Sequence, residues 1–184
     1  MKRWKKISTR QLLDHPRLTV YEDEVELPGG QRTGYIHFGL RYGSVCVITI
    51  DGQGRILLQR EYSYPPDEWL YQIPGGGIEK DETPEVAADR EMTEEAGLTG
   101  SLQELGWFYP DNRRRADKMR VFLATNLKPK EGKQDLEEAF ESFWFSTEQI
   151  ENMIAIGEIH NYATLAAWTF LKAHQKNDNF PGRK

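Results

Sequence analysis

Three glutamates, Glu91, Glu94 and Glu95, lie three and four residues apart in a stretch with a helical pattern. An α-helix turns once every 3.6 residues, so this spacing places the three carboxylates within roughly a 100° arc of one face. Like charges at this spacing repel one another, at about 0.2–0.5 kcal/mol per pair. Arg90 can pair with one carboxylate, whereas a hard divalent cation such as Mg²⁺ binds carboxylate oxygens and still accepts water and phosphate. The spacing therefore predicts a divalent-metal site.

The helix that must carry this face has clear start and stop signals. Thr83 can accept a hydrogen bond from a free backbone amide, Pro84 suits the first turn and Gly97 suits a left-handed end. We therefore predict a helix from Thr83 to Ala96. The stretch Gly75 to Gly77 precedes it and can bring backbone groups close to a metal or phosphate, because no Cβ intervenes.

The other side chains of this helix divide between packing and ligand access. We expect Val86, Met92 and Ala96 to pack on a sheet, and the small Ala87 and Ala88 to let a phosphate approach the acidic face. Asp89 falls among the packing positions, and the sequence offers no physical account of it.

The segment 76–98, GGIEKDETPEVAADREMTEEAGL, resembles the Nudix box. The matching positions are Gly76, Glu82, Arg90, Glu91, Met92, Glu94, Glu95, Gly97 and Leu98. The resemblance implies that Glu91, Glu95 and the Gly75 carbonyl bind metal, that Glu94 helps to hold a further metal, and that Arg90 and Glu82 orient the acidic cluster. It also implies Mg²⁺ as cofactor, with Mn²⁺ as a possible substitute, and cleavage of the pyrophosphate link of a nucleoside diphosphate derivative.

Three further segments resemble the ADP-ribose pyrophosphatase branch of that family. They are ILLQREYSYP at 56–65, QIPGG at 72–76 and GEIHNYATLAAW at 157–168. This resemblance implies a nucleoside diphosphate sugar as substrate, of the ADP-ribose or GDP-mannose type, cleaved to a nucleoside monophosphate and a sugar phosphate. Pro110 lies closer to the box than the usual proline of the branch, which leaves ADP-, GDP- and UDP-sugars open.

The branch also implies further site residues. A glutamate before a late strand often acts as general base there; Asp135, Glu137 and Glu138 occupy that region, and we choose Glu138. A solvated acidic loop is the alternative. We therefore expect Glu138, Glu94 and Arg90 to be catalytic.

Substrate contacts are expected from basic and aromatic residues. Arg60 can reach a phosphate from its strand end, and Arg113 begins a basic run that could do the same, although such runs are usually solvated. Tyr35, like Trp4 and Tyr64, could stack on a nucleobase, with packing in a core or interface as the alternative.

Strand patterns outnumber helical ones without strict alternation, which favours an α+β fold with helices on a mixed sheet. We expect strands at 20–27, 34–38, 44–50, 55–59, 69–73, 105–109, 119–124 and 140–145, and helices at 9–15, 147–156 and 161–174 in addition to 83–96. The first two strands should form a hairpin, and so should the next two. The Nudix resemblance implies an α/β/α sandwich with an N-terminal antiparallel β extension.

Three regions are predicted: an N-terminal β extension at 1–40, a catalytic domain at 41–176 and a flexible tail at 177–184. In the branch that the chain resembles, the N-terminal strands often swap across a dimer. We therefore expect residues 1–40 to form a homodimer interface.

Composition restricts the class of protein. The 184 residues are 38% hydrophobic and 29% charged, which predicts a folded chain of one domain plus an extension. A net charge of -5 argues against nucleic-acid polymers as partners. The single cysteine, Cys46, excludes an internal disulfide, and no apolar run resembles a signal peptide or membrane span. A small-molecule substrate and a cytoplasmic location are expected.

Two alternatives stay open. One is a Nudix hydrolase of nucleoside triphosphates or dinucleoside polyphosphates, which the resemblance of the late helix disfavours. The other is a non-catalytic Nudix ligand-binding module, which should tolerate loss of the box acids, whereas all of them are present here.

Overall fold

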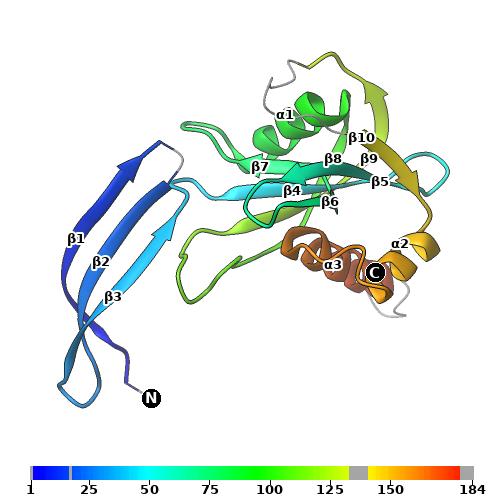
Figure 1. Ribbon diagram of the computed structural model, residues 1–184. Coiled ribbons are helices and arrows are strands. Elements are labelled where there is room, and N and C mark those ends of the chain that lie inside the picture. The colour runs from blue at the N-terminus through cyan, green and yellow to red at the C-terminus, as the bar shows by residue number, and fades with distance from the viewer. Residues whose placement is uncertain (1, 17, 133–140, 179–184) are drawn as a thin grey trace. The chain divides into compact units, whose positions relative to one another are not determined.

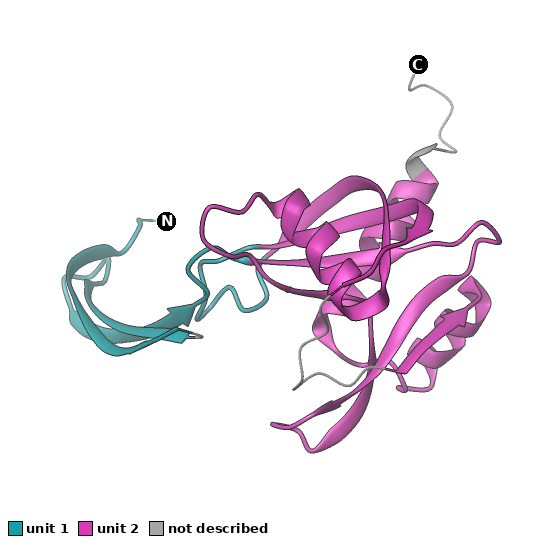
Figure 2. Cartoon of the chain, turned by 90° about the horizontal axis from the view of Figure 1, so that it is seen from above, with its two compact units in different colours: residues 1–43, 109–118 teal, residues 44–108, 119–184 magenta. Residues whose placement is uncertain are grey.

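The structure, a computed structural model, describes residues 2–16, 18–132 and 141–178. The chain divides into two compact units (Figure 2). Unit 1 consists of Met1–Gly43 and Tyr109–Lys118, and unit 2 consists of Ser44–Phe108 and Met119–Lys184.

Unit 1 is built on an antiparallel three-stranded sheet in the order β1-β2-β3 (Figure 1). Its strands are β1 (Lys5–His15), β2 (Leu18–Glu26) and β3 (Arg32–Gly39). The predicted hairpin of β2 and β3 is confirmed, with Leu27 and Gly30 bonded across the turn. The loop 109–118 is attached to β3, because the Phe38 amide donates to the Arg114 carbonyl. This sheet is the expected N-terminal β extension.

The helix predicted at 9–15 is wrong, because these residues belong to β1. A helix of seven residues cannot recover its nucleation cost without packing. Pairing with β2 instead satisfies the backbone and aligns polar side chains across the two strands. Thr9 donates to Asp23 at 2.6 Å, and Arg10 pairs with Glu22 at 2.6 Å. Pairing with residues of β2 therefore makes this segment a strand and not a helix.

Unit 2 contains two sheets. One has the order β7-β4-β9-β8 and is mixed, since β4 runs parallel to β9 while its other pairs are antiparallel. The other has the order β10-β5-β6 and is antiparallel. The strands are β4 (Ser44–Thr49), β5 (Ile56–Ser63), β6 (Glu68–Gln72), β7 (Gly75–Gly77), β8 (Leu98–Phe108), β9 (Met119–Pro129) and β10 (Glu141–Phe145). The predicted mixed sheet is confirmed.

The second predicted hairpin is wrong. The strands β4 and β5 form where expected, but they join different sheets and meet at an isolated bridge between Ile50 and Ile56. β4 is buried along its whole length and takes β7 and β9 as neighbours. The local turn signal at residues 51–54 could not reveal these distant partners.

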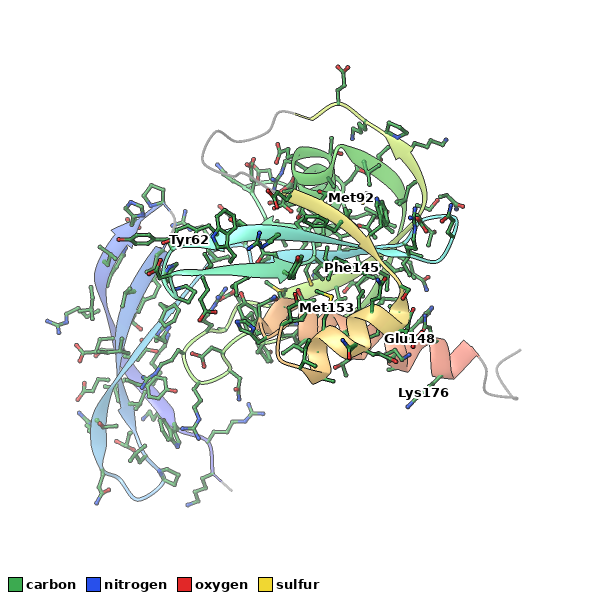
Figure 3. All side chains as sticks on the ribbon, turned by 45° about the vertical axis from the view of Figure 1, so that its right-hand side comes forward. Tyr62, Met92, Phe145, Glu148, Met153 and Lys176 are labelled. Atoms are coloured by element: carbon green, nitrogen blue, oxygen red, sulfur yellow. The ribbon has the colours of Figure 1, made fainter. Side chains whose placement is uncertain are left out.

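Helices cover both sides of the sheets in unit 2 (Figure 1). They are α1 (Pro84–Ala96), α2 (Thr147–Ala155) and α3 (Tyr162–Asp178). Side chains alternate along β4, so Val45 and Val47 pack with α1, whereas Cys46 and Ile48 belong to the core that includes residues of α2 and α3. Figure 3 shows Met92 on the α1 side and Met153 on the α2 side. The result is the expected α+β sandwich.

Several element ends differ from prediction, most of all those of β8, β9 and α3. β8 begins at Leu98 and β9 continues to Pro129, because the two strands pair along this polar stretch. α3 continues to Asp178, into the predicted tail. Among the described residues, no helix is long and apolar enough to cross a membrane.

Candidate active site

The helix α1 carries the three glutamates and has the predicted ends. The Thr83 hydroxyl accepts a hydrogen bond from the Val86 amide at 3.3 Å, and Pro84 occupies the first turn. Gly97 ends the helix with φ of 66°, a left-handed conformation that glycine adopts without steric cost. These local signals fix the two ends of α1, which belongs to unit 2 and carries the acidic face.

Arg90 gathers the acidic side chains around one guanidinium group. Its Nε and Nη2 donate to the Glu82 carboxylate at 2.9 and 3.1 Å, and its Nη1 donates to Glu91 at 2.9 Å and to Glu94 at 3.0 Å. Nη2 also donates to the Gly77 carbonyl at 2.9 Å. These contacts hold the start of α1, its acidic face and strand β7 together.

The charges in this network stabilise one another. Hydrogen bonding to Glu82 raises the pKa of Arg90, with further contributions from Glu91 and Glu94, so the guanidinium stays charged. Burial alone would raise the pKa of Glu82, but hydrogen bonds from Arg90 and the Glu79 amide outweigh it and lower that pKa. Both groups are therefore ionised at neutral pH.

Strand β7 approaches the acidic face very closely. The Gly75 amide donates to Oε2 of Glu95 at 3.1 Å. A Cβ at Gly76 would overlap the Glu91 carboxylate, and a Cβ at Gly75 would overlap the backbone of β4. Glycine is therefore required at Gly75, whereas a side chain at Gly76 would displace the Glu91 carboxylate. The two glycines bring backbone groups next to two of the three glutamates.

The donor set fits a hard divalent cation in chemical type, because carboxylate and carbonyl oxygens are the ligands that Mg²⁺ prefers. Glu91 and Glu95 both lie against β7, as a shared ion would require. Within the described part of the chain, however, no three His, Cys, Asp or Glu side chains converge on one point. Arg90 forms ion pairs with Glu91 and Glu94, so its guanidinium supplies positive charge to these two carboxylates.

A hollow of about 600 Å³ lies beside the last turn of α1. Glu94 and Glu95 line it on one side, and the end of β9 with the residues after it lines the other. The full lining consists of Thr93, Glu94, Glu95, Ala96, Gly97, Pro129, Lys130, Glu131 and Gly132. Part of the acidic face therefore borders a space large enough for a small ligand.

Two expectations for α1 were wrong. Ala87 and Ala88 are fully buried against Val45, Val47 and Phe122, so their small size allows close packing on the sheet and leaves no access for phosphate. Val86, expected to pack on the sheet, is exposed. The buried stripe is therefore shifted from the one that the sequence suggested.

Asp89 now has a physical explanation. Its carboxylate accepts hydrogen bonds from Thr99 at 2.5 Å and from Lys130 at 2.6 Å. Burial acts to raise the pKa of Asp89, but these partners lower it overall. Asp89 therefore connects α1 to β8 and to the end of β9, contacts that a reading of α1 alone could not anticipate.

The remaining predicted residues lie in different places. Arg60 is on β5 in unit 2, where its guanidinium stacks 5.1 Å from the centre of the Trp69 ring and lies 3.9 Å from Glu141. Tyr35 and Arg113 meet within unit 1, since the Tyr35 hydroxyl donates to the Arg113 carbonyl. Glu138 lies outside the described residues, as do Asp135 and Glu137.

Gln59 also contacts the acidic helix, although no sequence pattern singled it out. This residue is fully buried on β5, and its amide nitrogen donates to the backbone carbonyl of Glu95 at 2.9 Å. The available signal was a single polar residue directly after the apolar run Ile56, Leu57 and Leu58.

Comparisons with known proteins identify the family of the chain. The NUDIX domain family matches residues 40–167, and the nucleoside diphosphate sugar hydrolase N-terminal domain family matches residues 4–35. ADP-ribose pyrophosphatase of Bacillus subtilis is 31% identical over 135 residues, covering 73% of this chain and 72% of the relative. A CMP-5'-(N-acetyl-N-hydroxy-3-aminopropyl)phosphonate hydrolase of Streptomyces rubellomurinus is 28% identical over 156 residues, covering 84% and 75%.

A solved structure extends the likeness in fold to nearly the whole chain. The crystal structure of an ADP compounds hydrolase superposes with a TM-score of 0.87 over 97% of each chain, at 18% sequence identity. Identity at this level supports the Nudix fold alone, whereas the match of the family over residues 40–167 covers most of the chain. The chain therefore belongs to the Nudix family of hydrolases.

Proposed function

We propose that this protein is a Mg²⁺-dependent pyrophosphohydrolase of nucleoside diphosphate sugars, of the ADP-ribose or GDP-mannose type. Water attacks one phosphorus of the diphosphate, a new P–O bond forms, and the bridging P–O bond breaks. The products are a nucleoside monophosphate and a sugar phosphate. The observation that carries the proposal is the acidic face of α1 held against β7, where the Gly75 amide contacts Glu95.

The proposed metal ligands are Glu91, Glu94, Glu95 and the Gly75 carbonyl. Bound divalent cations would offset the charge of the diphosphate and favour ionisation of the attacking water. Arg90 holds Glu91 and Glu94 from the side, and it keeps its charge because of Glu82. Mn²⁺ should substitute for Mg²⁺, since both accept carboxylate oxygen.

The proposed substrate contacts are Arg60, Arg113 and Tyr35, and Glu138 is the proposed general base that accepts the proton of the attacking water. A basic side chain suits the diphosphate because charge-assisted hydrogen bonds to phosphate are strong. The names of the relatives from Bacillus subtilis and Streptomyces rubellomurinus support a substrate in which a phosphorus anhydride joins a nucleotide to another group.

A Mg²⁺-dependent substrate screen tests the proposal. ADP-ribose, GDP-mannose, UDP-glucose, NADH and nucleoside triphosphates are incubated with protein and Mg²⁺, and the products are identified by mass. Cleavage of a sugar nucleotide to a nucleoside monophosphate supports it. Preferred release of pyrophosphate or phosphate from triphosphates would favour the triphosphate alternative. Tight binding of a nucleotide without turnover would favour a binding module.

The role of the acidic face has its own test. Glu95→Gln should lower turnover by about 100-fold or more while the fold survives, because even residues that only support metal ligands contribute 10- to 100-fold. Glu85→Gln is the matched control, since Glu85 is exposed in the first turn of the same helix. Equal turnover of the two variants with Mg²⁺ would refute the metal role of Glu95.

We also propose that residues 1–40 form a homodimer interface and that residues 41–176 form the catalytic domain. Residues 1–40 leave large apolar side chains exposed, and exposed apolar patches commonly mark protein–protein interfaces. These are Trp4, Leu12, Leu13, Leu18 and Ile36, each between 37% and 54% exposed. Light scattering after gel filtration should give twice the chain mass of 21.3 kDa. A monomer at micromolar concentration would contradict the proposal.

A further inference from the structure

Gln59 is a buried polar residue in an apolar strand. It is 0% exposed, and the three residues before it on β5 are buried and hydrophobic. Burying an amide costs free energy unless its polar atoms find hydrogen-bond partners. The partners of Gln59 therefore indicate why an amide occupies this position.

Only one of the two polar atoms of the Gln59 side-chain amide has a hydrogen-bond partner among the described residues. Its Nε2 donates to the Glu95 carbonyl at 2.9 Å. The last four carbonyls of a helix have no partner within the helix, so this bond satisfies one of them from a strand outside α1. Its Oε1 is buried without a hydrogen-bond partner among the described residues. The amide therefore satisfies the Glu95 carbonyl but leaves one buried oxygen of its own unpaired, so its net contribution to stability is small.

Glu95 is consequently held at two points. Its carboxylate accepts from the Gly75 amide at 3.1 Å, and Gly75 belongs to the sheet β7-β4-β9-β8. Its backbone carbonyl accepts from Gln59, which belongs to the sheet β10-β5-β6. Each sheet therefore holds one end of the residue. Partners of this kind orient the groups that bind metals.

We propose that Gln59 is a positioning residue that fixes the Glu95 carboxylate in the geometry needed to bind a divalent cation. The inference rests on the proposed function, since the placement of Glu95 matters to catalysis only if the acidic face of α1 binds metal.

Two variants test this role. Gln59→Met and Gln59→Leu leave the Glu95 carbonyl without its donor but also remove the unpaired oxygen, so the two effects offset each other in part and the melting temperature should fall by only a few degrees. The affinity of the full chain for Mn²⁺ is measured by electron paramagnetic resonance in the absence of substrate. In both variants it should fall about tenfold. The Mg²⁺ concentration that half-saturates hydrolysis should rise by the same factor. At saturating Mg²⁺, the KM for the sugar nucleotide should stay near that of the unaltered protein.

Leu58→Val is the matched control. Leu58 is the neighbouring residue on β5 and equally buried, but it belongs to the core that includes α2 and α3 residues. This variant should lower the melting temperature and leave Mn²⁺ binding unchanged.

The outcomes separate the two proposals. Unchanged Mn²⁺ binding in both Gln59 variants overturns the positioning role while the hydrolase proposal stands. An equal loss of Mn²⁺ affinity in the Leu58 variant overturns it as well, because a general destabilisation of the core would then explain the effect. If the unaltered protein neither binds Mn²⁺ nor cleaves a sugar nucleotide, the proposed function fails and this inference falls with it.

Discussion

Replacing Arg90 by glutamine should reveal how strongly the acidic face depends on a counter-charge. Arg90 donates to Glu82, Glu91, Glu94 and the Gly77 carbonyl, and its side chain is only 23% exposed. Glutamine is neutral and shorter, so it cannot replace these contacts. Removing one partner from a buried charge cluster costs about 3–5 kcal/mol. Because Glu94 is 36% exposed and partly screened by water, we expect about 3 kcal/mol, the lower end of that range.

Thermal unfolding followed by circular dichroism gives the test. For a chain of this size, about 3 kcal/mol lowers the melting temperature by roughly 6–12 °C. In the presence of a chelator, the melting temperature of Arg90→Gln should fall by this full amount. Mg²⁺ should then raise its melting temperature more than that of the unaltered protein, because the cation supplies the positive charge that the guanidinium supplied.

Arg120→Gln is the matched control for this experiment. Arg120 pairs with Glu104 at 2.7 Å on the surface of unit 2, and a pair of that kind contributes about 0–1 kcal/mol. Its variant should unfold near the original temperature, with an unaltered response to Mg²⁺. A loss below about 1 kcal/mol for Arg90→Gln, or an identical Mg²⁺ response in all three proteins, would refute the reasoning.

Three further predictions follow from individual groups. Thr83→Ala removes the cap of α1 and should cost about 1 kcal/mol in urea denaturation, with a loss under a few tenths contradicting the capping role. Burial raises the pKa of Cys46 to about 12, so the native thiol should resist alkylation at pH 8 and react after unfolding; rapid native labelling would show otherwise. The folded pKa of Glu82 lies below its ordinary 4.5, so its stabilising contribution is complete above that pH and is lost as pH falls through the folded pKa. Glu82→Gln should therefore unfold with a shallower acid dependence, and an unchanged slope would count against the Glu82–Arg90 pair.

The candidate metal-binding helix could be predicted from the sequence because its determinants are local. Thr83, Pro84 and Gly97 act on backbone groups within a few residues of themselves, so their effect does not depend on the rest of the fold. The spacing of Glu91, Glu94 and Glu95 likewise sets their common face through helix geometry alone. The same holds for the β2–β3 hairpin, whose turn lies between its strands.

Other features depended on partners that are far away in the sequence. Residues 9–15 form a strand because they pair with β2. The strands β4 and β5 do not form a paired hairpin, because β4 pairs with β7 and β9 whereas β5 pairs with β6. Ala87 and Ala88 were wrongly assigned to the ligand side, since the sheet that covers them is not visible in a helical pattern.

The sequence by itself determined the acidic helix, its ends and the glycines before it, because short-range backbone sterics and hydrogen bonding act within one turn or loop. Only the tertiary structure decided which groups surround that helix. Asp89 meets Lys130, Gly75 meets Glu95, and Gln59 meets the end of α1, all across at least twenty residues of chain. Such contacts form only when folding brings separate strands together, so no local pattern encodes them.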